Sequence, residues 1–460
     1  MLKGRSATLA LAIMAPLLSQ PAIAQDKPFQ GVTLNVASIK WDFMETLLGV
    51  YAKQAAEDLG IDLRVSWFTY EGHRNKLVAD NLANVPTWDL VYVDMKQLPE
   101  FAGAGILEPL DGKFSAEFDQ ADFSGYAIDS VTYEGNIYAV PFSADPNGLV
   151  YRKDLFENAE EQAAFKAKYG YDLVVPTNYT QYRDVAEFFT RKSGEKLAGE
   201  VLQNDFYGSS QSNKVPDFLW QDYISYMKAF GGEVYDTATM KPTWNGAGSV
   251  EAGRLYASLA PFWPPAHINM TSGESMSEFD KGRVAMIIEY YSRIVYLGNP
   301  ATSAITGKFD YALLPTARED RPHATLAHVN SLGIYGKSRQ KKAALALLQK
   351  IMGKEVAKAW ALHEPTESFR AGNPLFPRNS VLSDAALLAK FPSLALVAAT
   401  LDGKSVYAFG HYRIVEYPEI VEIVTTAVSN TLTGAPVDDQ FNEAQAKLES
   451  LFDQAGYGKQ

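Results

Sequence analysis

The chain has 460 residues, of which 47% are hydrophobic and 21% charged, a balance that excludes an intrinsically disordered protein. Its formal net charge of −12 argues against nucleic acid and anionic membrane surfaces as partners. It contains no cysteine, which excludes disulfides and thiol chemistry. The length is too great for one ordinary core and predicts more than one domain.

The first 24 residues have the pattern of a secretory signal peptide. Lys3 and Arg5 form a basic start, "ATLALAIMAPLL" is an apolar run, and "AIA" at 22–24 fits a cleavage site before Gln25. No later stretch reaches the roughly 18 uninterrupted apolar residues of a membrane span. We therefore expect export to a bacterial periplasm, with cleavage after Ala24.

The elements that follow alternate between strands and helices. β-branched and alternating patterns predict strands at 31–39, 61–68 and 88–94. Apolar residues at helical spacing predict helices at 44–60 and 74–84 between them. This β-α-β-α-β order predicts an α/β layer with a largely parallel sheet.

The rest of the chain is richer in helices and has no internal repeat. It is expected to be mostly helical from Asp384 onward. Helices are also expected at 159–170, 182–202, 217–232, 250–262 and 339–363, and strands at 282–291, 309–315 and 331–336.

No catalytic or metal-binding signature is present. The sequence lacks a G-x-S-x-G elbow, a Walker loop and H-E-x-x-H, and its six histidines form no i, i+4 pair. The adjacent tyrosines in "EYYSR" (289–293) could offer two phenolates to ferric iron, although packing or ligand contact is the more ordinary role of such a pair. We therefore expect no enzymatic activity, no cofactor and no bound metal.

Five segments in order give the chain a family resemblance. They are "WDLVYVDMKQLPEFAGAGILEPLD", "IYAVPFSADPNGLVYRKDLF", "FDKGRVAMIIE", "FDYALLPTARED" and "SLGIYGKSRQKKAALALLQKIM". With them the chain resembles the extracellular solute-binding proteins of ABC importers, in the sugar-binding group that includes maltose-binding protein. The resemblance covers essentially the whole mature chain.

The resemblance implies an α/β, two-lobed periplasmic binding protein fold of type II, with a ligand cleft between lobes joined by crossing segments. On this basis we expect lobe one at 26–143 plus 316–362, lobe two at 147–308 plus 370–460, and crossings near 141–151, 309–315 and 363–370. Pro141 and Pro146 restrict the backbone of the first crossing, which suits a connector. Asp145, between them, is expected to contact the ligand; the alternative is a turn acid that caps "NGL".

The remaining ligand candidates follow strand ends, where open α/β sheets place their ligands. Trp41 and Tyr70 are candidate aromatic platforms for a sugar face, and core packing is the alternative for Trp41. His328 departs from a usually glycine-rich family loop, so it marks specificity or is a satisfied structural histidine. Gln211 and Arg370 have ordinary loop and surface roles as alternatives. The full set of candidates is Lys40, Trp41, Asp42, Tyr70, Asp94, Asp145, Gln211, Glu289, Tyr290, Tyr291, His328, Asn330 and Arg370.

The function implied by the resemblance is that of a periplasmic binding component of an ABC importer. It would capture a sugar, an oligosaccharide or a sugar alcohol by lobe closure and deliver it to inner-membrane permease subunits, acting as a monomer. Two alternatives from the residues stay open. The acids beside aromatics could bind a polyamine or ferric iron, and widely spaced carboxylate pairs leave a secreted glycosidase or lyase possible.

Overall fold

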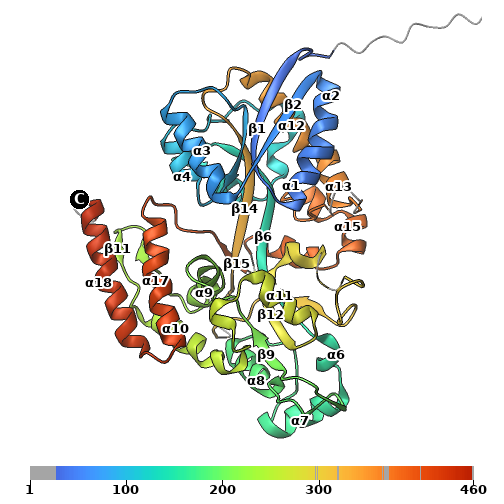
Figure 1. Ribbon diagram of the computed structural model, residues 1–460, viewed down its shortest axis with the longest axis vertical. Helices are drawn as coiled ribbons and strands as arrows, with labels where there is room; N and C mark the ends of the chain where they lie inside the picture. The colour runs from blue at the N-terminus through green and yellow to red at the C-terminus, as the bar shows by residue number, and fades with distance from the viewer. Residues whose placement is uncertain are drawn as a thin grey trace, which may run out of the picture.

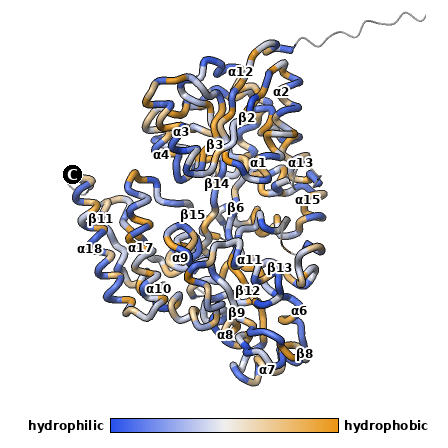
Figure 2. Tube along the Cα trace, in the orientation of Figure 1, coloured by the Kyte–Doolittle hydropathy of each residue, from blue (hydrophilic) through white to orange (hydrophobic). Residues whose placement is uncertain are grey.

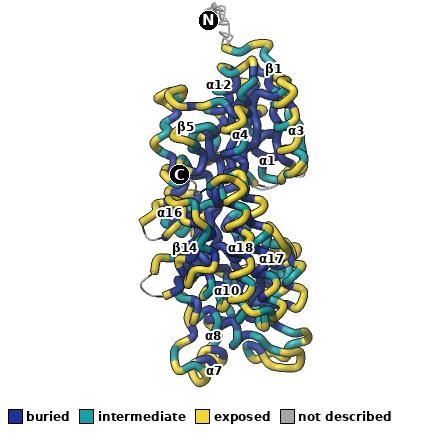
Figure 3. The backbone as a smooth tube through the Cα atoms, turned by 90° about the vertical axis from the view of Figure 1, so that its left-hand side faces the viewer, coloured by how far each residue is buried: buried dark blue, intermediate teal, exposed yellow. Residues whose placement is uncertain are grey.

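The protein has two lobes, one above the other, joined by long strands (Figure 1). The computed structural model describes residues 27–295, 297, 299–318, 321–364, 366, 372–404 and 406–457. Buried hydrophobic residues form two large clusters, and we call the parts of the chain around them lobe one and lobe two. Hydrophobic stretches lie inside both lobes (Figure 2), and exposed segments surround a buried interior in each (Figure 3).

Lobe one contains the parallel sheet that the sequence predicts. Strands β1 (Val32–Ile39), β2 (Ile61–Phe68) and β3 (Leu90–Asp94) pair in the order β2-β1-β3, and both pairings are parallel. All five residues of β3 are buried, as expected for a parallel strand covered on both faces. Helices connect and cover these strands: α1 (Asp42–Thr46), α2 (Lys53–Leu59), α3 (Tyr70–Leu82) and α4 (Leu98–Gly103).

Two long antiparallel strands, β6 (Ala139–Tyr151) and β14 (His323–Ile334), connect the lobes (Figure 1). Strand β6 runs from lobe one into lobe two, and β14 runs back. They join the sheet of lobe one to that of lobe two, in the order β2-β1-β3-β14-β6-β12-β9. Pro141 and Pro146 both lie in the half of β6 that pairs with β14 alone among the strands. A missing ladder donor is therefore tolerated there, because one side of β6 needs no strand partner.

The first crossing lies where we expected it, and the second does not. Along β6, Ala144 packs in the core of lobe one and Leu149 in that of lobe two. The expected second crossing, 309–315, contains β13 (Asp310–Ala312), which pairs with the lobe-two end of β6. The chain crosses instead within β14, between Leu326 and Ala327. The short "FDYALLP" pattern has no feature that separates an edge strand from a connector.

Lobe two is a smaller sheet surrounded by helices. Its strands β9 (Tyr207–Ser210) and β12 (Val284–Tyr290) are parallel, and β12 is antiparallel to β6. Its helices and hairpin strands are α6 (Lys153–Phe156), α7 (Ala159–Tyr169), α8 (Tyr179–Phe189), β7 (Lys196–Leu197), β8 (Glu200–Val201), α9 (Asp217–Ala229), β10 (Tyr235–Asp236), β11 (Lys241–Pro242), α10 (Ala247–Leu259) and α11 (Ser272–Asp280).

The C-terminal part of the chain is divided between the lobes, which corrects the expected assignment of 370–460 to lobe two. Leu375 and helices α14 (Asn379–Leu382), α15 (Ala385–Lys390) and α16 (Leu394–Leu401) place their buried apolar side chains in the core of lobe one. The chain then returns through β15 (Val406–Phe409), parallel to β14. Helices α17 (Tyr417–Leu432) and α18 (Val437–Ala455) complete lobe two. Part of the expected third crossing, 363–370, lies outside the described residues.

Two predicted helices are shorter than their apolar patterns suggest. The helix predicted over 182–202 ends at Phe189, and the β7–β8 hairpin follows, with Gly194 and Gly199 at positive φ. The stretch 339–363 divides into α12 (Lys341–Ile351) and α13 (Lys354–Ala361). Gly353 caps the second of these in an extended conformation, which ends the continuous helical path. None of the helices in the described ranges has the length and apolar character that a membrane crossing requires.

Candidate functional site

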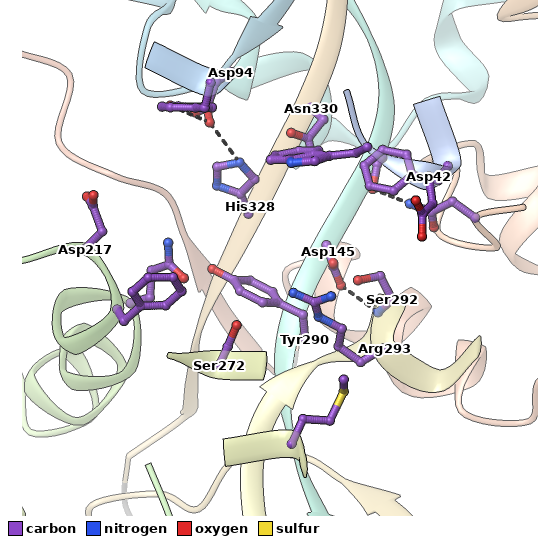
Figure 4. A pocket seen from close by; sticks show the side chains of 18 of the residues that line it. Asp42, Asp94, Asp145, Asp217, Ser272, Tyr290, Ser292, Arg293, His328 and Asn330 are labelled. Carbon is purple, nitrogen blue, oxygen red and sulfur yellow. Dashed lines mark hydrogen bonds and ion pairs between the residues drawn. The ribbon is translucent and has the colours of Figure 1, made fainter. Parts of the chain in front are cut away.

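A cavity of about 670 Å³ lies between the lobes, beside the crossing strands. Its lining comes from the ends of lobe-one strands, from β6 and β14, and from helices and loops of lobe two (Figure 4). Nine predicted residues line it: Lys40, Trp41, Asp42, Tyr70, Asp94, Asp145, Tyr290, His328 and Asn330. Sequence reasoning brought the lobe-one members together because the carboxyl ends of parallel strands meet at one edge of a sheet.

Three predicted residues do not line the cavity, and one cannot be placed. Gln211 is fully buried within lobe two, where its Nε2 donates to the hydroxyls of Tyr182 and Tyr226. Tyr291 donates its hydroxyl to the carbonyl of Ala312 and packs over Gly148. Glu289 is buried and does not reach the surface of the cavity. Arg370 lies outside the described residues.

The Tyr290–Tyr291 pair does not offer two phenolates to one ion. Tyr290 projects into the cavity toward His328 (Figure 4), whereas Tyr291 is buried on the other side of the strand end. Tyr290 is the last residue of β12, whereas Tyr291 begins a 3₁₀ turn (Tyr291–Val295), and this change of backbone conformation separates the two hydroxyls. In the described ranges no group of three or more His, Asp or Glu side chains is arranged to hold a metal ion. The geometry therefore speaks against the ferric-iron alternative.

Asp94, at the end of β3, is the most fully satisfied acid of the site. Its carboxylate accepts hydrogen bonds from the Tyr70 hydroxyl at 2.9 Å and the Lys96 backbone N–H at 2.8 Å, and His328 Nε2 lies 3.2 Å away. Burial would raise the pKa of Asp94. The neighbouring His328 and Lys96 and these hydrogen bonds outweigh burial and hold the pKa well below its usual range. Asp94 is therefore a fixed negative charge.

Asp145 belongs to the crossing strand β6 and is not a turn cap. It lies opposite His328 of β14 in the antiparallel ladder, which corrects the turn alternative. Its Oδ1 accepts a hydrogen bond from the backbone N–H of Ser292 in lobe two, at 3.0 Å. Burial raises the pKa of this carboxyl to about 6, against the lowering effects of Ser292 and Arg293. The hydrogen bond thus connects the crossing strand β6 to the segment that follows β12 and lines the cavity.

Glu289 stands behind Tyr290 with few partners of its own. Its Oε1 accepts from the Tyr290 backbone N–H and lies 3.8 Å from Arg293 Nε. Burial raises the pKa of Glu289 to about 7; Arg293 opposes this shift, and the nearby Asp145 adds to it. Arg293 therefore lowers the pKa of both Asp145 and Glu289, and its side chain also lines the cavity.

Aromatic and amide groups complete the site. Trp41 is 37% exposed, and its ring contacts Phe43 and Tyr92 at its edges, so the core alternative for this residue is wrong. Asn330 is oriented by Tyr92, whose hydroxyl donates to Asn330 Oδ1 and leaves the amide N–H₂ for other partners. A flat exposed ring beside oriented polar groups suits a ligand with both C–H faces and hydroxyls.

Sequence reasoning missed more than half of the lining. The residues missed are Phe43, Lys96, Ser143, Asp217, Phe218, Gln221, Ser272, Met276, Ser292, Arg293, Gly372 and Asn373. Lys96 and Arg293 follow strand ends by two or three positions, so a wider window after each strand would have found them. Asp217 and Ser272 begin helices far from any strand end, and only packing brings them to the cleft.

The model of the family described as bacterial extracellular solute-binding protein matches residues 42–358, well over half of the chain. The chain belongs to this family. The match confirms the resemblance, and the two-lobed fold around a polar cleft agrees with it.

Proteins similar to this solute-binding protein include some named for, or solved with, a sugar alcohol. The mannitol-binding protein of Pseudomonas aeruginosa is 24% identical over 464 residues, covering 97% of this chain and 98% of that protein. An ABC transporter solute-binding protein of Agrobacterium radiobacter, solved in complex with ribitol, is 28% identical with a TM-score of 0.75, covering 93% of this chain and 100% of that one. A protein of Agrobacterium vitis with bound D-mannitol shares the fold at 21% identity and a TM-score of 0.70, covering 92% and 99%.

Proposed function

We propose that this solute-binding protein is the periplasmic binding component of an ABC importer and captures a small carbohydrate, with sugar alcohols as the favoured class. The observation that carries the proposal is the cleft itself. Oriented polar groups of both lobes face one cavity beside the crossing strands, together with the exposed ring of Trp41. The proposed signal peptide, residues 1–24, would direct export, and the partner would be a membrane permease.

The chemistry of the cleft fits a ligand rich in hydroxyl groups. A hydroxyl both donates and accepts, so it can pair with the acceptors Asp94 and Asp145 and with the donors Asn330 and Arg293. The acids and cations that line the cavity are mixed, which favours a neutral ligand over one of high net charge.

The relatives support the sugar-alcohol class within the carbohydrates. One is a mannitol-binding protein and another was solved in complex with ribitol, and each aligns over almost the whole chain. An open-chain polyol presents a row of hydroxyls with little apolar face. Such a ligand requires many hydrogen-bonding groups and few flat platforms, in agreement with a cleft where Trp41 is the most exposed aromatic ring.

Closure of the lobes would hold the ligand. A ligand that contacts both lobes binds the closed form more tightly than the open form, and it shifts the equilibrium by that difference in affinity. The strands β6 and β14 are the elements on which such a motion would turn. Capture requires no covalent step, so we propose that the protein catalyses no reaction.

The proposal is tested with the mature chain, residues 25–460, freed of co-purifying ligand by unfolding and refolding. Ribitol, mannitol, maltose and spermidine are compared by thermal shift, and any hit is titrated by calorimetry. We expect ribitol or mannitol to raise Tm by mass action, equivalent to about 2.7 kcal/mol at a ligand concentration of 100 Kd. If spermidine alone stabilises the protein, the carbohydrate proposal is wrong and a polyamine is the ligand. Release of a product from the bound carbohydrate, followed by mass spectrometry, would overturn the non-enzymatic proposal.

A further inference from the structure

A second histidine, His411, lies against the cleft residue His328. It follows β15 in the segment that leads to α17, and it is only 5% exposed. The rings of His328 and His411 are 5.6 Å apart between centroids and lie nearly perpendicular. The preceding residue, Gly410, lies close to lobe one, since a Cβ there would come within 2.3 Å of the end of the Met95 side chain. Close packing against lobe one thus brings His411 to the back of the cleft wall.

Each imidazole has one nitrogen with a partner and one without, within the described part of the chain. His328 Nε2 is 3.2 Å from the Asp94 carboxylate, and the hydroxyl of Tyr417 is 2.7 Å from His411 Nδ1. The other two nitrogens, His328 Nδ1 and His411 Nε2, are buried and have no hydrogen-bond partner. Leaving buried polar atoms unpaired is costly, so two such atoms on adjacent rings call for an explanation.

The two unpaired nitrogens are chemically complementary. A carboxylate only accepts, so Nε2 of His328 carries a proton, and a ring with that single proton has an acceptor at Nδ1. Burial, with the nearby charge of Lys96, lowers the pKa of His411 well below its usual range, so this ring is neutral. When Nδ1 of His411 accepts from Tyr417, its Nε2 carries the proton and is a donor.

We propose that His411 is a positioning residue for His328: its Nε2–H pairs with His328 Nδ1 through one water molecule. The resulting relay runs from Tyr417 in lobe two, through His411 and His328, to Asp94 in lobe one, where Tyr70 also donates. It fixes the ring plane of His328 in the cavity and supplies a donor to its Nδ1. It also links a lobe-two helix to the ligand wall across the hinge strand β14, by a contact that the sequence motifs did not single out.

The test reads the tautomer of His328 directly. Long-range ¹H–¹⁵N spectra of the ligand-free mature protein report which ring nitrogen carries the proton, and a His328→Gln variant assigns the signals. We expect a protonated Nε2 and an unprotonated Nδ1 in the parent chain. His411→Phe should move the ¹⁵N signal of His328 Nδ1, which loses its hydrogen-bond donor, while Asp94 keeps the proton on Nε2. His411→Gln, which keeps a donor near the Nε2 position, should restore the parent signal. An unchanged His328 pattern in His411→Phe would overturn the proposal.

Affinity provides a second readout, and this part rests on the proposed function. For whichever of ribitol or mannitol binds, loss of one orienting hydrogen bond predicts roughly 3- to 10-fold weaker binding in His411→Phe. Tyr417→Phe should weaken binding less. His267→Phe is the matched control, because His267 is also buried and bonded to Asn213 but lies away from the cavity. It should lower Tm without changing affinity or the His328 signals.

The two proposals fail in different ways. If neither polyol binds the parent chain, the proposed function fails, while the spectra of the ligand-free protein still decide the relay. If His411→Phe unfolds, the comparison is made with Tyr417→Phe and His411→Gln, which keep most of the packing volume. Normal affinity together with an unaltered His328 Nδ1 signal in Tyr417→Phe would then contradict the relay.

Discussion

The two walls of the cleft hold their acids in opposite ways. On the lobe-one wall, Asp94 has three partners, and its pKa lies below the usual range. On the lobe-two side, Asp145 and Glu289 each accept one backbone hydrogen bond, and burial raises their pKa values to about 6 and about 7. Burial alone does not decide the charge of a carboxyl; the charges and hydrogen-bond donors around it decide with it.

This difference assigns different tasks to the walls. A carboxylate with all its donors in place is preorganised, and it contributes to folding before any ligand arrives. A buried carboxyl with few donors gains most from a partner that brings them, such as a hydroxyl-rich ligand or the guanidinium of Arg293. We expect lobe one to provide a rigid surface and lobe two to provide groups whose energies change on binding.

Removal of Asp94 is the most severe test of the rigid wall. Asp94→Ala would leave the Tyr70 hydroxyl, the Lys96 N–H and His328 without their shared acceptor in a buried site. Breaking such a buried network is expected to lower the free energy of unfolding by about 3–5 kcal/mol, measured by urea denaturation at neutral pH. Asp217→Ala, at an exposed acid of the same cavity, is the control and should change stability by less than about 0.5 kcal/mol. Equal effects of the two variants would erase the proposed contrast.

Asp145 tests the ligand contact proposed for the crossing strand. Asp145→Ala leaves ligand hydroxyls and the Ser292 N–H unpaired, so affinity for the bound polyol should fall roughly 10- to 150-fold, the equivalent of about 1.5–3 kcal/mol. Asp145→Asn keeps an acceptor for Ser292 and removes the charge, so its Tm should stay close to the parent value while its affinity still falls. Calorimetric titration that finds unchanged affinity in the Ala variant would remove Asp145 from the ligand site.

The pH dependence of Glu289 sharpens the comparison. The folded pKa of about 7 lies above the ordinary value of 4.5, so the native state binds the extra proton between these two values. Stability from this group is therefore present below about pH 4.5 and is lost as pH rises through 7. Glu289→Gln should gain on the order of 1–3 kcal/mol over the parent at pH 8, and little at pH 5.

Only the difference between variant and parent is informative in that experiment. Buried His73 and His267 have pKa values lowered to about 4 by burial, so they destabilise the fold as pH falls below their ordinary value of 6.5. They act oppositely to Glu289 in the parent and the variant alike. Urea denaturation at the two pH values, with Glu57→Gln as an exposed control, isolates the contribution of Glu289 to the free energy of unfolding. A gain that is the same at pH 5 and pH 8 would contradict a raised pKa.

The smallest expected effect belongs to the ring on the rigid wall. Trp41→Ala removes a partly exposed platform that supports no buried network, so Tm should change little. Affinity should fall roughly 2- to 10-fold, as expected for one aromatic contact of about 0.5–1.5 kcal/mol. Trp41→Phe is the matched control and should recover most of the loss. A large fall in Tm in Trp41→Ala would instead show that Trp41 acts as a core residue and would contradict its role as a platform.

The sequence by itself determined the fold class, the parallel sheet of lobe one and the polar residues at the ends of its strands. Local periodicity predicts each of these strands, and strands that run parallel must end at one edge. For this reason Lys40, Asp42, Tyr70 and Asp94, which lie far apart in the chain, could be assigned to one site from sequence alone.

Only the tertiary structure decided which side chains of lobe two face the ligand. The pairing of β12 with β6 sets the phase of the strand and turns Tyr290 into the cleft, and the 3₁₀ turn that follows carries Tyr291 away from it. Helix packing, not sequence spacing, carries Asp217 to the same cavity. Packing of the segment around Gly410 against Met95 of lobe one likewise brings His411 into contact with His328, which lies 83 positions earlier in the chain. Such contacts depend on how distant segments dock, and no local pattern in a single chain encodes them.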